Sequence, residues 1–287
     1  MKMVHINSLI VPKAFLTNTA SLPAAPSPET PARKRRPPRR VEVSRVEILS
    51  PAMRRITLTG AEMEGFPSVG PASYIKLIFP EPGQTEPARP LPDGPRAVSM
   101  RTYTPLAVRP DRLEVDVDFV LHGEGPASTW AAKASVGQVL YLMGPGPGYL
   151  PDASCMQHLL LADDSALPAV ETILTALPAS ARAQVLLEVI SDAEQRPLHS
   201  AAQLDVTWLV RGTDHRAAGQ PLAAALHALG PVGPDTRIYL ACEAAAMRRI
   251  RQQLIDHLGV SRSQIVGRGY WKLDVVNHPD HDYGDDA

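Results

Sequence analysis

Residues 113–120 read Leu-Glu-Val-Asp-Val-Asp-Phe-Val, and apolar and acidic side chains alternate without a break from Leu113 to Phe119. Successive side chains of a β-strand point to opposite faces, so this alternation predicts a strand. Shorter stretches on both sides have a similar character, and several short strands at this spacing are typical of an antiparallel barrel. The other predicted strands cover residues 41–48, 56–58, 74–79 and 139–143, and the predicted loops cover 80–95 and 144–148.

The pattern changes after Pro151. A short apolar run at 158–162 has the character of a buried parallel strand, and helical and strand-like stretches alternate from there on. Such alternation predicts a parallel sheet with helices on its faces. The expected fold class is therefore β + α/β: an antiparallel β-barrel domain at 39–150, then a Rossmann-like parallel α/β domain at 151–276. Its further predicted strands are 185–190, 206–210 and 238–242, and its predicted helices are 166–177, 222–229 and 243–258.

Both ends of the chain are expected to be disordered. Residues 1–38 form an arm rich in proline and arginine, which cannot bury enough apolar surface to offset the entropy of ordering. The basic cluster at 33–36 is interpreted as part of a solvated linker, with contact to nucleic acid or acidic lipid as the alternative. Residues 277–287 form an acidic tail, for which weak metal binding through its histidines is the alternative to disorder.

Composition removes several classes of protein. The 287 residues carry a net charge of -1, so no overall field draws the chain to nucleic acid or to a membrane. Two cysteines are too few for an iron–sulfur cluster held by four thiolates or for a disulfide framework. No apolar run reaches the roughly 18 residues of a membrane span, and a secretory leader is not expected. We therefore expect a cytoplasmic protein, in which any iron belongs to a ligand.

A candidate binding motif, Arg101-Thr-Tyr-Thr104, lies in the predicted barrel just before Pro105. On an extended chain the side chains of Arg101 and Tyr103 point to the same side. A guanidinium can clamp a pyrophosphate, a phenol ring can stack on a flat heteroaromatic ring, and the hydroxyl or amide of Thr104 can bond a ring nitrogen. For the motif taken alone, an ordinary strand with an exposed arginine and a core tyrosine is the alternative.

Longer segments make the motif specific. Arg101-Thr-Tyr-Thr104 resembles the Arg-x-Tyr-Ser/Thr flavin signature of the ferredoxin–NADP reductase superfamily. Residues 118–123, Asp-Phe-Val-Leu-His-Gly, and 125–131, Gly-Pro-Ala-Ser-Thr-Trp-Ala, resemble the siderophore-interacting proteins, which are FAD-dependent reductases of ferric siderophores. The similarity runs from about residue 36 to about residue 273, and other segments that carry it are 36–60, 66–80, 166–178 and 269–271.

The resemblance implies cofactor contacts in the barrel. The pyrophosphate, the isoalloxazine face and the ring edge of FAD would be contacted by Arg101, Tyr103 and Thr104 in turn. Contacts to the ribityl chain and the adenosine part are implied at Asp118, Phe119, Val120 and His122, with a structural histidine as the alternative for the last. Backbone amides and a hydroxyl at the start of a short predicted helix would face the pyrophosphate, from Gly125, Pro126, Ala127 and Ser128.

In the α/β domain the resemblance points to residues 162–168, a turn that follows a strand and opens a helix. Open α/β sheets bind ligands at the carboxyl ends of their strands. Asp164 and Ser165 stand in place of the Glu-Thr of the family's turn, and Ala162 stands where glycine is common. Because Ser165 keeps the hydroxyl, Asp164 and Ser165 are expected to contact the flavin or the nicotinamide. A glycine-rich dinucleotide fingerprint is missing, so donor binding is inferred from fold analogy.

Two aromatic residues near the chain end, Tyr270 and Trp271, are further candidates. In the superfamily a terminal aromatic covers the flavin and moves aside for nicotinamide, and packing of the last strand is the alternative for either ring. A positive rim for an anionic ferric chelate is predicted at Lys272, Arg268 and Arg248, with solvated surface side chains as the alternative. Catalytic acids, bases and protein metal ligands are not expected, because electron transfer to a chelated iron requires none.

The expected function is reduction of a ferric siderophore with release of Fe(II). Electrons would come from NAD(P)H, or from reduced ferredoxin, through FAD, which accepts two electrons and gives them up singly. Three alternatives stay open: a flavin reductase with another acceptor, a siderophore-binding or shuttle protein without flavin, and a nucleic-acid partner acting through the basic arm. The flavin motifs argue against the second alternative, and the nearly neutral net charge argues against the third.

Overall fold

The computed structural model of the chain describes residues 37–91, 99–122, 125–149, 151, 155–275 and 278. The basic cluster at 33–36 and almost all of the arm and the acidic tail lie outside these residues, so the predictions made for them stay predictions. Residues 36–287 form one compact unit, which contains two sheets.

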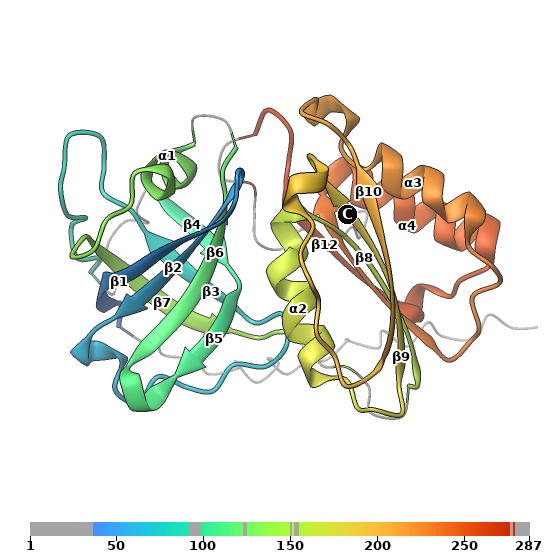
Figure 1. The fold of residues 1–287 in the computed structure, drawn as a ribbon, viewed down its shortest axis with the longest axis horizontal. Helices are drawn as coiled ribbons and strands as arrows, with labels where there is room; N and C mark the ends of the chain where they lie inside the picture. The colour runs from blue at the N-terminus through green and yellow to red at the C-terminus, as the bar shows by residue number, and fades with distance from the viewer. Residues whose placement is uncertain are drawn as a thin grey trace, which may run out of the picture. The chain divides into compact units, whose positions relative to one another are not determined.

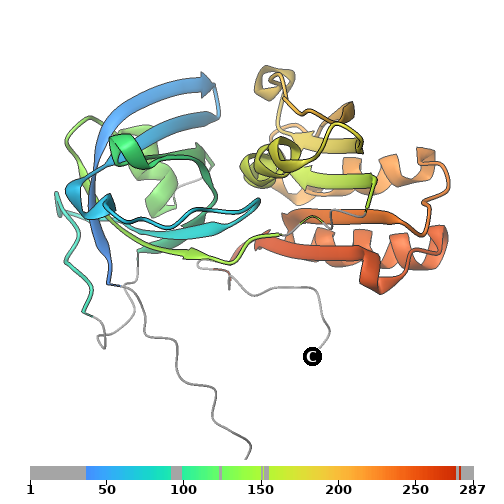
Figure 2. The ribbon, with the colours of Figure 1, turned by 90° about the horizontal axis from the view of Figure 1, so that it is seen from below.

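The first sheet has seven strands in the order β4-β3-β7-β1-β2-β6-β5, and its strand pairs are antiparallel. Only Thr104 separates β4 from β5 along the chain, yet these are the two outer strands of the sheet. The sheet must therefore roll until its edges approach each other at Thr104, and Figure 2 shows it curling back on itself. This confirms the predicted antiparallel barrel, whose elements are β1 (Arg39–Ser50), β2 (Met53–Thr59), β3 (Tyr74–Ile78), β4 (Met100–Tyr103), β5 (Pro105–Arg109), β6 (Glu114–Val120), α1 (Pro126–Ala132) and β7 (Val139–Gly146).

The barrel core follows from the alternation in β6. Val115, Val117 and Phe119 are fully buried in one apolar cluster with residues of the other barrel strands. The acidic residues between them, Asp116 and Asp118, are buried too. Arginines from other segments cover them, as the ion pairs described below show.

Strand β7 extends further than the sequence predicted. A loop was expected at 144–148, but β7 continues to Gly146, which pairs with Tyr74 on β3. A Cβ atom at Gly146 would lie 2.1 Å from the ring of Tyr74, so glycine lets the strand pass this ring in its present position. The short strand β5 was not predicted either, because it begins with Pro105, and proline weakens a strand signal.

The second sheet has five parallel strands in the order β10-β9-β8-β11-β12. The middle residues of its inner strands β8 and β11 are apolar and buried, because helices cover both faces. Helix α2 packs on one face, and α3 and α4 pack on the other (Figure 1). The α/β prediction is confirmed, with the elements β8 (Gln157–Asp163), α2 (Leu167–Ala176), β9 (Arg182–Val189), β10 (Gln203–Val210), α3 (Gln220–Ala225), β11 (Thr236–Glu243), α4 (Ala244–Leu258) and β12 (Ile265–Trp271).

Specific hydrogen bonds join the barrel to the α/β segment. The carboxylate of Glu194, in the short helix η4 (Asp192–Glu194), accepts from the hydroxyl of Ser50 and from the amide of Ala52, the latter at 3.1 Å. The amide of Ala72 donates to Oγ1 of Thr172 on α2 at 2.9 Å.

In the part of the chain that the structure describes, no helix is long and apolar enough to cross a membrane.

Candidate functional site

The motif Arg101-Thr-Tyr-Thr104 forms strand β4 and the single residue that follows it. Arg101 is half-buried and donates from Nη1 to the carbonyl of Met100 at 2.9 Å, and burial lowers the pKa of its guanidinium. The ring of Tyr103 packs against Phe119, with 4.4 Å between the centroids, and burial raises the pKa of its phenol. The motif therefore presents a cation and a partly accessible aromatic ring from one strand.

The aromatic ring of Tyr103 belongs to a larger cluster in the barrel. Phe79 and Phe119 meet it and each other at edge-on or tilted angles, and Trp130 on α1 packs against both phenylalanines. This packing holds the ring of Tyr103 in one position. A ring held in this way can stack on a flat ligand without losing much side-chain entropy.

The start of α1 combines a glycine, a proline and two small residues. Gly125 precedes the helix, Pro126 occupies its first turn, and α1 is seven residues long. Oγ of Ser128 accepts a hydrogen bond from the amide of His122 at 2.9 Å. A hydroxyl that accepts still has its own proton to donate, so Ser128 keeps a donor for a ligand oxygen. The roles of Gly125, Pro126, Ala127 and Ser128 on a pyrophosphate stay predictions.

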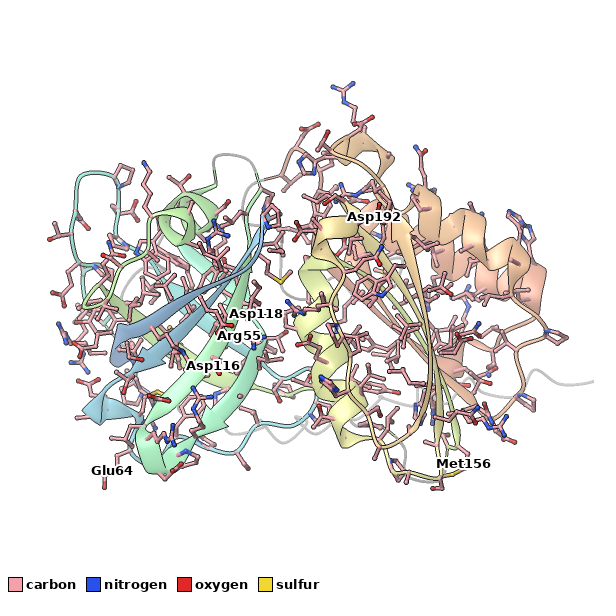
Figure 3. The ribbon with its side chains drawn as sticks, in the orientation of Figure 1. Arg55, Glu64, Asp116, Asp118, Met156 and Asp192 are labelled. Atoms are coloured by element: carbon pink, nitrogen blue, oxygen red, sulfur yellow. The ribbon has the colours of Figure 1, made fainter. Side chains whose placement is uncertain are left out.

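Four further barrel residues were predicted to contact FAD, and the structure gives them different surroundings. Asp118 is held by Arg55 at 2.7 and 2.9 Å and by Arg196 at 2.9 Å, so its carboxylate is occupied (Figure 3). Phe119 is fully buried in the aromatic cluster, so contacts from Asp118 and Phe119 can involve only backbone atoms. Val120 is half-buried and His122 is exposed, and their predicted contacts stay predictions.

The carboxyl ends of the parallel strands bring together acidic residues that are far apart in the sequence. Asp163 ends β8, Asp164 follows it, Glu188 lies near the end of β9, and Glu243 ends β11. All four residues are buried. Arg211, which follows β10 and has a side chain only 2% exposed, lies 3.2 Å from Glu188 and 3.4 Å from Asp164. Sequence reasoning singled out only Asp164 from this group.

Asp163 is the most highly bonded member of this group. Its Oδ1 accepts from the amide and the hydroxyl of Ser165, at 3.0 and 2.5 Å. Its Oδ2 accepts from the amide of Glu243 at 3.0 Å and from Nε1 of Trp271 at 2.8 Å. Two predicted site residues, Ser165 and Trp271, therefore meet on one carboxylate that was not predicted.

The electrostatics of Asp164 and Glu188 follow from burial. Burial, helped by the neighbouring charge of Asp163, raises the pKa of Asp164 to about 7, and Arg211 opposes this. Burial also raises the pKa of Glu188, against the amides of Gly219 and Leu222 that bond its carboxylate. Part of this cluster therefore carries protons near neutral pH.

Two histidines extend the site. The ring of His215, in the short helix η5 (His215–Ala217), lies edge-on to the ring of Trp271 with 6.3 Å between centroids. His122 of the barrel lies close enough to His215, Asp163 and Arg211 to interact with their charges. The predicted residues His122, Ser165 and Trp271 thus surround the same region.

Tyr270 and Trp271 differ in their surroundings. The hydroxyl of Tyr270 lies 2.9 Å from that of Tyr239 and shares a hydrogen bond with Thr104, and its ring packs on the apolar cluster under α2. Thr104 and Tyr270, which were predicted separately, are therefore neighbours. The hydrogen bonds and packing of Tyr270 fix its ring inside the protein, whereas Trp271 lies at the carboxyl edge among polar groups.

The predicted positive rim is spread over two elements. Arg248 is exposed on α4, Arg268 is half-buried on β12, and Lys272 is exposed just after it. Their joint action on an anionic chelate stays a prediction. The described residues contain no group of three or more histidine, cysteine, aspartate or glutamate side chains that could hold a metal ion.

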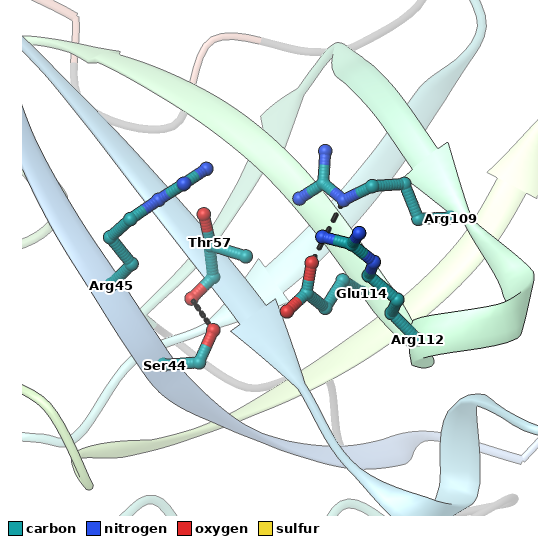
Figure 4. A pocket seen from close by; sticks show the side chains of 6 residues that line it. All are labelled: Ser44, Arg45, Thr57, Arg109, Arg112 and Glu114. Atoms are coloured by element: carbon teal, nitrogen blue, oxygen red, sulfur yellow. Dashed lines mark hydrogen bonds and ion pairs between the residues drawn. The ribbon is translucent and has the colours of Figure 1, made fainter.

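A separate hollow lies on the outside of the barrel (Figure 4). It has a volume of about 370 Å³. Arg109 on its wall bonds Glu114 at 2.8 Å and Asp116 at 2.7 Å, so this cation is already neutralised. None of the predicted site residues lines the hollow, which is formed by Ser44, Arg45, Thr57, Arg109, Arg112 and Glu114.

Comparison with known proteins supports a family assignment. Residues 42–149 match the siderophore-interacting FAD-binding domain and residues 155–274 match the siderophore-interacting protein domain. The ferric vibriobactin reductase ViuB of Vibrio cholerae is 33% identical over 245 residues, which cover 82% of this chain and 89% of that protein. The NADPH-dependent ferric-chelate reductase of Escherichia coli is 33% identical over 197 residues, 64% of this chain and 75% of that protein.

A solved structure supports the same assignment. A siderophore utilization protein from T. fusca superimposes with a TM-score of 0.76 at 30% identity, over 86% of this chain and 98% of that one. The domain matches, the relatives and the shared fold agree with the motifs at 101–104, 118–123 and 125–131. The chain therefore belongs to the siderophore-interacting protein family, and its barrel is the FAD-binding domain of that family.

Proposed function

We propose that this protein is a FAD-dependent oxidoreductase that takes electrons from NAD(P)H and reduces ferric siderophores, releasing Fe(II). The observation that carries this proposal is the similarity to the ferric vibriobactin reductase of V. cholerae, which extends over 82% of the chain. The relative in E. coli, named for its use of NADPH, supports a nicotinamide donor. Reduced ferredoxin is the second donor to test.

The described residues fit FAD. Arg101 supplies a half-buried cation for a pyrophosphate, Ser128 keeps a hydroxyl proton for a phosphate oxygen, and Tyr103 supplies a fixed ring for stacking. Thr104 would reach the ring edge, held there by Tyr270. Bound FAD would supply the conversion of a two-electron hydride donor into two one-electron transfers.

The overall reaction balances without a protein nucleophile or acid. One NAD(P)H and two Fe(III) give one NAD(P)⁺, two Fe(II) and one proton. Fe(III) is a hard cation that siderophore oxygens hold tightly, and Fe(II) is held far less strongly, so reduction releases the metal. Within the ranges that the structure describes, no metal-binding cluster competes for the released ion.

The remaining details belong to the same proposal. The FAD-binding domain would span 39–150 and the donor-binding domain 151–276, with Asp164 and Ser165 near the nicotinamide. Lys272, Arg268 and Arg248 would attract an anionic chelate through long-range charge. The proposed place of action is the cytoplasm, where NAD(P)H and reduced ferredoxin are available.

One anaerobic experiment tests the function. The purified protein should be yellow, should lose its flavin absorbance with NADH or NADPH, and should regain it when a ferric siderophore is added with an Fe(II) trap. Regain with trapped Fe(II) supports the proposal. Regain only with another acceptor would show a different flavin reductase, and a protein that is colourless and takes up no FAD would be a binding protein instead.

A further inference from the structure

The segment that follows β12 is held by two buried carboxylates. Asp163 accepts from Nε1 of Trp271 at 2.8 Å, and Glu243 accepts from the amide of Leu273 at 3.3 Å. The two carboxylates are themselves connected, because the amide of Glu243 donates to Asp163 at 3.0 Å. The turn that follows β12 is therefore tied to the ends of β8 and β11.

The bonding of Asp163 requires a carboxylate. All four of its partners are donors: the amide and the hydroxyl of Ser165, the amide of Glu243 and the indole of Trp271. A carboxylate has enough lone pairs for four donors, whereas an amide has one accepting oxygen and an NH₂ group that donates. An asparagine at this position would place its NH₂ group against two other N–H groups, or else against Ser165.

Hydrogen bonds to a buried charge are strong, and a lost donor leaves part of that charge unsatisfied. Asp163 is 1% exposed, so water does not replace a donor that leaves. Trp271 has a single N–H, and that N–H is already bonded to Asp163. The ring of His215 packs edge-on against the indole. Any swing of the indole would therefore have to break a charged hydrogen bond and a ring contact together.

From this geometry we infer that Asp163 is a positioning residue that fixes the indole of Trp271 at the carboxyl edge of the sheet. The inference rests on the proposed function, because the indole matters for catalysis only if flavin and nicotinamide meet there. It differs from the expectation that a terminal aromatic moves aside for the donor. The donor would instead approach around a fixed ring.

Indole hydrogen exchange tests the inference on the full chain loaded with FAD. The protein has three tryptophans, so a ¹H–¹⁵N spectrum shows three indole signals, and Trp271→Phe assigns the one from Trp271. In the wild type this N–H should exchange slowly, and Asp163→Asn should accelerate its exchange at least about tenfold, the effect expected for losing a charge-assisted bond. Asp164→Asn is the comparison variant, since Asp164 is adjacent and buried but bonds Arg211 and the amide of Ser165 rather than the indole, and it should accelerate exchange far less than Asp163→Asn.

A kinetic cycle supplies the second readout. Asp163→Asn and Trp271→Phe should change the rate of flavin reduction by the donor in the same direction, and the double variant should differ from Trp271→Phe by less than about twofold. Independent, multiplicative effects would overturn the positioning role. Saturating donor should leave the indole signal of Trp271 in place, and a large shift or loss of protection would show that the ring swings.

Failure of this inference can be told apart from failure of the proposed function. If Asp163→Asn does not fold, the wild type alone still tests the inference. An indole N–H of Trp271 that exchanges at the rate of a free indole contradicts a fixed ring. If the wild type takes up no FAD, the proposed function fails. The exchange experiment can then be run on the flavin-free chain, where slow exchange supports the positioning role of Asp163 and fast exchange overturns it.

Discussion

At the scale of single residues, charge in the α/β site is governed by burial. Two of the four buried carboxylates, Asp164 and Glu188, pair with the buried guanidinium of Arg211, and the partners of Asp163 and Glu243 are hydrogen-bond donors. Such an arrangement keeps some groups ionised through hydrogen bonds and leaves others to hold a proton. Burial raises the pKa of both Asp163 and Asp164; the bonds from Ser165 and Trp271 oppose the shift of Asp163, whereas the charge of Asp163 adds to the shift of Asp164.

Arg101 is the residue whose removal should affect the cofactor most. Arg101→Ala removes the half-buried cation of β4, and we expect the dissociation constant for FAD to rise at least about tenfold, the usual loss for one charge-assisted bond. A fluorescence titration measures this dissociation constant, and the flavin content after gel filtration measures FAD retention. Arg45→Ala, also on the barrel but beside the separate outer hollow, is the control. Equal FAD retention in both variants would remove Arg101 from the cofactor site.

Asp164 should make the stability of the protein depend on pH. Its pKa is raised from the unfolded value of 3.8 to about 7, so the folded state holds its proton more tightly. Between these two values the folded state binds more protons than the unfolded state, and stability therefore falls as pH rises, by at most about 1.4 kcal/mol per pH unit. The group's favourable contribution is complete below pH 3.8 and is lost by about pH 7.

Urea unfolding of the wild type and Asp164→Asn between pH 5 and 8 measures this contribution. The wild type should lose stability relative to the variant as pH rises to about 7, and the difference should then level off. A constant difference across this range would show that Asp164 titrates at its usual value. Thr213→Ala, an exposed change two residues after Arg211, should run parallel to the wild type.

At the scale of elements, the end of β7 and the segment just after it depend on two glycines, Gly146 and Gly148. A Cβ atom at Gly148 would lie 2.1 Å from the carbonyl oxygen of Pro71 and 2.6 Å from the amide nitrogen of Ser73, both backbone atoms. At Gly146 the obstacle is the outer end of the Tyr74 ring, which can move aside. Gly148→Ala should therefore destabilise the protein by about 1–3 kcal/mol, the usual cost of overpacking, and Gly146→Ala by less.

Chemical denaturation of the two glycine variants provides the measurement. The pair is well matched, since both positions lie at the end of β7 and both changes add one methyl group. A larger loss for Gly146→Ala than for Gly148→Ala would contradict the close approach of residues 71–73.

The sequence predicted the elements whose residues repeat in a regular pattern. The alternation in β6 and the apolar run in β8 were enough to identify a barrel followed by a parallel sheet. The alternation could not show what covers Asp116 and Asp118, because Arg109, Arg55 and Arg196 come from three other segments. Strand β12 was not among the predicted strands, because two glycines interrupt its apolar residues.

The candidate site likewise contains residues that the sequence could predict and residues that it could not. Motifs that are contiguous in the sequence, such as 101–104 and 125–128, could be identified from their residue types. The acidic group could not, since Asp163, Glu188 and Glu243 lie on three strands that meet only in the folded sheet. One signal was present: a lone glutamate inside the apolar strand β9 is unusual, and in a parallel sheet it points to the functional edge.

At the scale of the whole molecule, one arginine connects several parts of the chain. Arg196 bonds Asp118 of β6 at 2.9 Å and Glu171 of α2 at 2.7 Å, and it also contacts the sulfur of Met53 on β2. Its side chain is 17% exposed, and Asp118 is fully buried. Burial raises the pKa of Glu171, and the charge and hydrogen bond of Arg196 oppose this shift, so Arg196 stabilises the ionised form of Glu171.

Arg196→Ala should weaken the connection between the barrel and the α/β segment. Asp118 would keep its ion pair with Arg55, but Glu171 would lose its ion pair with Arg196. We expect the free energy of unfolding to fall by roughly 1–3 kcal/mol. Because the lost bonds link two cores rather than one, unfolding should also become less cooperative, with two resolved transitions in calorimetry instead of one. Arg109→Ala is the control, since Arg109 also bonds two carboxylates, but both belong to the barrel. It should lower the melting temperature of the barrel without the same loss of coupling, so a splitting that is equal in both variants would contradict the connecting role of Arg196.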